Sequence, residues 1–149
     1  MGRISVSEEI DAPPARVWRV IEPIERHVEW MQDARSIRFE DEQRSGVGTR
    51  FVCETKVGPI TLHDRMEITE WEQDRRMGVR HSGVVTGSGA FELVPIDLDR
   101  RTRFMWTEDL RFPRYLGGRL GERLGGQWVL RSIWRRNLKA LARLVEQSP

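Results

Sequence analysis

The chain has 149 residues, of which 38% are hydrophobic and 32% charged, and its 25 Lys and Arg residues nearly balance its 23 Asp and Glu residues. This length fits a single domain spanning residues 1–149, and a net charge of +2 is too small for a general nucleic-acid-binding protein. The lone cysteine excludes an internal disulfide, and the lack of a signal-peptide pattern or long apolar run predicts a cytoplasmic protein without a transmembrane segment.

The first thirty residues predict one strand followed by two short helices. Apolar residues alternate with polar ones over residues 3–10, which is typical of a half-buried strand. Two prolines then precede apolar residues at helical spacing, which predicts a helix over residues 13–22 that is broken near Pro23. A second short helix is expected over residues 25–31.

Residues 35–111 predict about six further strands. Period-2 alternation recurs along this region, most clearly over residues 60–68, and glycine-containing turns separate the alternating segments. The connections are too short for crossover helices, so the strands are expected to pair antiparallel through hairpins.

The C-terminal part returns to a helical period. A broad apolar face predicts a long helix over residues 127–146. Five glycines weaken the helical pattern of residues 114–126, although Leu116, Leu120 and Leu124 form a stripe there. We expect this segment to be a mobile gate; with Arg119 and Arg123, its stripe is also a candidate for peripheral contact with an anionic membrane.

Three segments resemble one known family. They are IDAPPARVW at residues 10–18, ITEWE at 68–72 and TRFMWTED at 102–109. The chain resembles the polyketide cyclase/dehydrase and lipid-transport group of the START-like (SRPBCC, Bet v 1-like) superfamily. The resemblance implies an α+β helix-grip fold, in which a curved antiparallel sheet of about seven strands wraps the long C-terminal helix, with two short helices after the first strand.

A sheet that wraps a helix leaves space between them for a small molecule. The resemblance implies that a ligand is enclosed in this space, and the apolar residues in the inward registers of this chain agree with that. The first hypothesis is therefore binding of a small hydrophobic ligand such as a lipid, a quinone or a polyketide-like molecule. The residues expected to line the cavity are Phe51, Leu62, Met66, Val79, Phe91, Phe104, Trp106, Trp134 and Leu138.

Three ionisable residues fall in registers that otherwise point inward: Asp64, His81 and Glu108. A buried carboxylate needs a partner, so the two acids are expected to contact His81. Such a set is a candidate for acid and base catalysis in an aromatase/cyclase or dehydratase, for orienting a ligand, or, if the register slips by one residue, for simple exposure to solvent.

Other features predict no chemistry. His27 and His63 are expected to be solvated, Cys53 to be inert, and Gly83 to Gly89 to be a hairpin turn, because no helix follows it as a phosphate-binding loop requires. No motif indicates a metal or a cofactor. The remaining alternative is a protein-interaction module that uses the basic C-terminal helix; the sequence leaves the oligomeric state open.

Overall fold

The computed structural model describes residues 3–114 and 126–148. Its elements are β1 (Arg3–Ile10), α1 (Pro14–Ile21), the 3-10 helix η1 (Ile24–Glu29), β2 (Ala34–Phe39), β3 (Arg50–Val57), β4 (Ile60–Glu72), β5 (Arg76–Ser82), β6 (Thr86–Ile96), β7 (Arg101–Arg111) and α3 (Gln127–Gln147). This order confirms the predicted α+β helix-grip fold. None of the helices in the described part of the chain has the length and apolar character needed to cross a bilayer.

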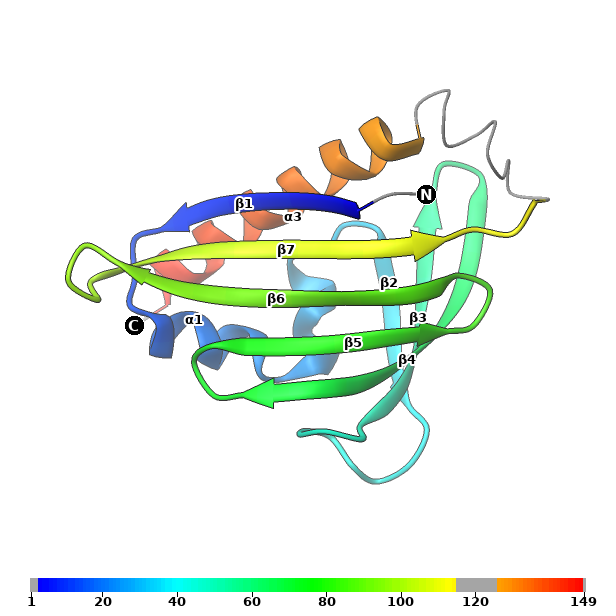
Figure 1. Ribbon diagram of the computed structural model, residues 1–149, viewed down its shortest axis with the longest axis horizontal. Helices are drawn as coiled ribbons and strands as arrows, with labels where there is room; N and C mark the ends of the chain where they lie inside the picture. Colours follow the sequence, from blue (N-terminus) through cyan, green and yellow to red (C-terminus); the bar gives the residue numbers. More distant parts are fainter. Residues whose placement is uncertain (1–2, 115–125, 149) are drawn as a thin grey trace.

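All seven strands form one antiparallel sheet in the order β1-β7-β6-β5-β4-β3-β2. The sheet curves strongly, so that β3 and β2 run steeply across the direction of β5, β6 and β7, while the helices lie on one face (Figure 1). A register shift between Ile68 and Glu70 falls where β4 passes from β3 to β5. Such a bulge increases the local bend and twist, which is what a sheet that closes around a helix needs.

Alternation along the strands and helical spacing along α3 bring the core together. On β7 every second residue from Thr102 to Leu110 is buried, and α3 buries a stripe that includes Trp134, Leu138 and Leu141. Trp18 and Trp30 are each 1% exposed, and neither lines the cavity described below, as expected for large aromatic residues that close one end of the sheet.

Two local predictions need correction. The second short helix is a 3-10 helix over Ile24–Glu29, so it ends two residues before the predicted residue 31. The expected turn from Gly83 to Gly89 is shorter, because β6 begins at Thr86 and contains both Gly87 and Gly89. The predicted gate and leucine stripe fall mostly on residues 115–125, which lie outside the described residues.

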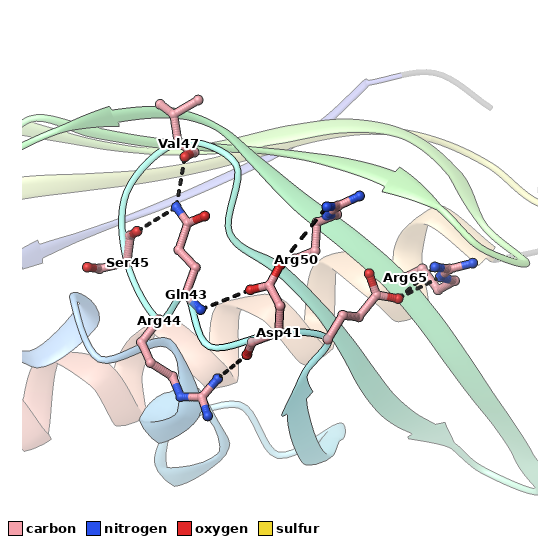
Figure 2. A network of polar contacts seen from close by, with 8 residues as sticks. Asp41, Gln43, Arg44, Ser45, Val47, Arg50 and Arg65 are labelled. Atoms are coloured by element: carbon pink, nitrogen blue, oxygen red, sulfur yellow. Dashed lines mark hydrogen bonds and ion pairs between the residues drawn. The ribbon is translucent and has the colours of Figure 1, made fainter.

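The loop between β2 and β3 is held by its own polar groups (Figure 2). Gln43 donates from its side chain to the carbonyl oxygens of Ser45 and Val47, and its backbone N–H donates to the Asp41 carboxylate. Arg44 donates to the Asp41 carbonyl oxygen. These contacts fix a loop of exposed residues at the rim of the sheet, away from the buried polar groups described below.

Candidate functional site

A cavity of about 150 Å³ lies inside the curved sheet. Its walls come from β2 to β7, from His27 of η1, and from Leu130 and Trp134 of α3. Cavities of about this volume in other proteins hold a single aromatic ring. The predicted residues that line it are Phe51, Leu62, Met66, Val79, Phe91, Trp106 and Trp134; their contact with a ligand stays a prediction.

The other two predicted lining residues are placed differently. Phe104 and Leu138 are both fully buried and do not border the cavity. Phe104 packs edge-on against Trp30, with 6.5 Å between ring centroids, beneath the short helices. Leu138 lies one helical turn beyond Trp134, where α3 packs into the solid core. Both residues therefore stabilise the fold by burial.

Aromatic rings form one wall of the cavity. Trp106 stacks on Trp134 with 4.9 Å between ring centroids and 19° between ring planes, and it meets Phe91 edge-on at 5.4 Å. This arrangement links the sheet to α3 across the cavity wall. Rigid aromatic rings offer a molecule of similar size large apolar contact at little cost in conformational entropy.

The polar end of the cavity is a buried chain of three ionisable groups. Nδ1 of His81 lies 2.6 Å from Oδ2 of Asp64, and Nε2 of His81 lies 3.0 Å from Oε2 of Glu108. Nε1 of Trp106 donates to the other Glu108 oxygen, Oε1, at 3.0 Å. The predicted contact of both acids with His81 is therefore confirmed, and all three residues are at most 8% exposed.

One glycine on β6, Gly89, makes this chain possible. His81 on β5 and Glu108 on β7 are separated by β6, where they face Gly87 and Gly89 respectively. A Cβ atom at residue 89 would stand 2.1 Å from Oε2 of Glu108, so the carboxylate occupies the space that a side chain there would fill. The signal in the sequence is a Gly-Ser-Gly pattern, which predicts a turn when read locally but inside a strand often marks close approach of another group.

His81 is held as a cation. Burial by itself would lower its pKa, but the hydrogen bonds to Asp64 and Glu108 and the charges of the two carboxylates raise the pKa to about 10. At neutral pH both ring nitrogens then carry hydrogen and both donate, one to each acid. An imidazolium engaged at both ends orients the two carboxylates and has no lone pair with which to accept a proton.

His27 corrects a prediction, because it is buried instead of solvated. Its Nε2 lies 2.6 Å from the Ile21 carbonyl oxygen, and its ring packs against Trp30 and Phe91 with centroids 5.3 and 5.8 Å away. The 3-10 turn of η1 directs the neighbouring charges outward and this ring inward. Burial lowers the pKa of His27 to about 4, so the ring is neutral and Nε2 donates to the carbonyl.

His27 should therefore make stability fall in acid. Its folded pKa lies below the ordinary value of about 6.5, so its contribution is complete above that pH and is lost as the pH falls toward 4. Between pH 6 and 4.5 the free energy of unfolding of the wild type should fall, relative to His27→Gln, by ~1.4 kcal/mol per pH unit. Urea unfolding at several pH values measures this; the exposed His63→Gln should keep the wild-type slope, and equal slopes for His27→Gln and wild type would contradict the assignment.

Asn137 of α3 is a buried polar residue that the sequence analysis missed. Its Nδ2 donates to Oδ1 of Asp33 at 2.8 Å, and its Oδ1 accepts from the backbone N–H of Gln32 at 3.0 Å. It therefore ties the segment after η1 to the long helix, and Asp33 borders the cavity. A polar residue within the apolar stripe of α3 was the signal that could have found it.

The remaining candidates are placed as follows. His63 is exposed, as predicted, with 67% of its side chain accessible. Burial raises the pKa of the Cys53 thiol to about 11, so it is protonated at neutral pH and is a poor nucleophile. Within residues 3–114 and 126–148, no group of three or more His, Cys, Asp or Glu side chains is placed to hold a metal ion.

Comparison with known proteins gives one family and many solved structures. The family model for polyketide cyclase / dehydrase and lipid transport matches residues 1–146. A crystal structure from Thermus thermophilus is 22% identical, with a TM-score of 0.79 and coverage of 98% of this chain and 99% of the other. No curated protein matches the chain.

Two further structures share the fold. A START superfamily protein from Mycobacterium smegmatis is 12% identical, with a TM-score of 0.75 and coverage of 99% of both chains. The Zhui aromatase/cyclase from a Streptomyces species is 17% identical, with a TM-score of 0.74 and coverage of 97% of this chain and 93% of the other. At these identities the likeness concerns the fold alone.

Proposed function

Because the chain belongs to the polyketide cyclase/dehydrase and lipid transport family, we propose that its single domain binds one small, mainly apolar molecule of about the size of an aromatic ring. The observation that carries this proposal is the cavity of about 150 Å³, lined mainly by apolar side chains, with the buried ionic chain of Asp64, His81 and Glu108 on its lining. A core that only stabilises the fold is close-packed, without a space of that size, and it rarely buries charged groups next to such a space.

The volume favours a compact molecule over a long lipid chain. Sites for larger metabolites usually enclose about 300–1,000 Å³, whereas this cavity encloses about 150 Å³. A monocyclic compound or a quinone-like ring matches a space of this volume that is lined by Trp106, Trp134 and aliphatic side chains. The ionic chain would then meet the polar substituent of that ring.

Binding of such a small molecule should be weak. Removing about 250 Å² of apolar surface from water contributes roughly 6 kcal/mol, and a hydrogen bond to a charged group adds about 2 kcal/mol. Association costs at least about 4 kcal/mol. The remainder corresponds to a Kd of about 1 mM for a ring with one matched polar group.

Benzyl alcohol and toluene are suitable first probes, and NMR titration suits this affinity range. We expect benzyl alcohol to shift the amide signals of residues around the cavity and to saturate with a Kd of about 1 mM. Val79→Phe, which places a ring in the cavity, should abolish binding. Val94→Phe, at a position that does not line the cavity, should leave it unchanged. If neither probe binds the folded protein, or if Val79→Phe binds as well as wild type, the proposed function is wrong.

Acid and base catalysis of the aromatase/cyclase or dehydratase kind is a second candidate function. One observation favours it: Oδ1 of Asp64 is buried without a hydrogen-bond partner among the described residues, as a carboxylate oxygen that waits for a substrate proton would be. His81 is a poor base because both nitrogens are engaged. In this function Asp64 would be the base, and Asp64→Asn should stop turnover while binding persists.

A further inference from the structure

The side-chain donors at the polar end of the cavity are already engaged. The two N–H groups of His81 meet Asp64 and Glu108, and the indole N–H of Trp106 meets Glu108. The N–H of neutral His27 donates to a backbone carbonyl oxygen. A carbonyl group on a ligand would therefore find none of these four N–H groups free.

Acceptors, in contrast, are in excess. Oδ1 of Asp64 is buried and has no partner among the described residues, and the Asp64 side chain is 11% exposed. Asp33, Asp64 and Glu108 all border the cavity, and no Lys or Arg does so within residues 3–114 and 126–148. His81 is therefore the one cation beside three acidic side chains on this described lining, and burial raises the pKa of the Asp33 carboxyl.

Three neutral groups that can form hydrogen bonds remain on the lining: the thiol of Cys53, the hydroxyl of Thr55 and the indole N–H of Trp134. The thiol of Cys53 and the hydroxyl of Thr55 lie 3.7 Å from each other. A thiol is a weak donor, a hydroxyl can turn to donate or to accept, and the Trp134 N–H is one neutral donor on a lining that carries three acids, so acceptors remain in excess. The N–H donors of His81 and Trp106 beside Asp64 and Glu108 are therefore all engaged, whereas an acceptor oxygen of Asp64 is not.

We propose that the bound molecule presents a hydrogen-bond donor, a hydroxyl or an ammonium group, to the carboxylates of Asp64 and Glu108, and that anionic or acceptor-only ends are rejected. This inference rests on the proposed function and names the chemical class of its ligand. A donor would satisfy the unpartnered oxygen of Asp64. A ligand carboxylate would add negative charge beside three acids at low dielectric, and a ketone would set its lone pairs against theirs.

A set of five ring compounds of nearly equal size tests this directly: benzyl alcohol, benzylamine, toluene, acetophenone and benzoate. NMR titration of the wild type at pH 7 should give at least about tenfold tighter binding for benzyl alcohol or benzylamine than for acetophenone, and no saturation with benzoate. Equal or tighter binding of acetophenone or benzoate would overturn the inference and leave the proposed function standing. If none of the five compounds binds, both fail.

Asp64→Asn provides the matched variant, because it keeps shape and exchanges one acceptor for a donor. The amide oxygen stays opposite Nδ1 of His81, and the NH₂ group takes the place of the unpartnered oxygen. The preference should then reverse: the affinity for benzyl alcohol should fall about tenfold or more, and the affinity for acetophenone should rise. Asp109→Asn makes the same change at an exposed residue next to Glu108 and should keep the wild-type order.

The thermal midpoint shows whether Asp64→Asn folds. If it does not, Glu108→Gln is used in its place: its amide oxygen can still accept from His81 or Trp106, while its NH₂ group faces the other N–H and removes one acceptor from the ionic chain. An unchanged preference in the folded variant would overturn the inference, because it would mean that the ligand end does not meet these carboxylates.

Discussion

His81→Ala is expected to lower the free energy of unfolding by about 3–5 kcal/mol near pH 6.5, because it leaves two buried carboxylates without their shared cation. The side chain of His81 is 7% exposed, and those of Asp64 and Glu108 are 11% and 8% exposed, so water cannot replace it fully. Urea unfolding of both proteins measures the difference. His63→Ala, at an exposed histidine, should change stability by less than about 0.5 kcal/mol.

The pH dependence of this loss has a definite sign. The folded pKa of His81, about 10, lies above the ordinary value, so its contribution is complete below about pH 6.5 and is lost as the pH rises toward 10. The gap between wild type and His81→Ala should therefore narrow by ~1.4 kcal/mol per pH unit between pH 7.5 and 9.5. The assignment of His81 as a cation would be contradicted if His81→Ala lowered the free energy of unfolding by less than about 1 kcal/mol. It would also be contradicted if the difference between the two proteins widened with rising pH.

Gly89→Ala is expected to lower the free energy of unfolding by roughly 3 kcal/mol. The reason is that its methyl group would collide with the Glu108 carboxylate and displace it from His81 and Trp106. The added Cβ would lie 2.1 Å from Oε2 and 2.3 Å from Cδ of Glu108. Ser88→Ala, at the exposed neighbouring residue of β6, should be nearly neutral. Chemical unfolding measures both variants.

A double-mutant cycle separates this collision from a general effect of glycine on the strand. In a Glu108→Ala background the obstacle is absent, so Gly89→Ala should cost less than about 1 kcal/mol there. Equal costs in the two backgrounds would show that the glycine serves the backbone of β6 and not the ionic chain. Binding of benzyl alcohol should weaken in Gly89→Ala alone, since the polar end of the cavity is then displaced.

The sequence predicted the strands, the long helix and the inward registers because these follow from periods of 2 and 3.6. Asp64, His81 and Glu108 each lie in an apolar register, so a correct register was enough to bring them inside. Periodicity identifies which residues of a strand face inward, however, and does not identify which of these residues border the cavity. Phe104 and Trp106 share one face of β7, yet only Trp106 lines the cavity.

The features that sequence reasoning missed depend on tertiary contacts. His27 is buried because η1 turns back toward the end of α1, which no local pattern records. Gly87 and Gly89 resembled a turn because glycine is the usual turn residue; their role becomes visible only when β7 is placed beside β6. The position of Asn137 was readable as a polar break in the apolar stripe of α3, but its partners after η1 were not.

The central claim is that a ring-sized molecule occupies the cavity inside the sheet, and intermolecular NOEs test it most directly. With saturating benzyl alcohol, the ring protons should give NOEs to the methyl groups of Leu62, Met66 and Val79. These three residues lie on β4 and β5 and line the cavity. NOEs confined to exposed methyl groups such as those of Val47 and Leu98, which are 61% and 88% exposed, would place the molecule on the surface and contradict the claim.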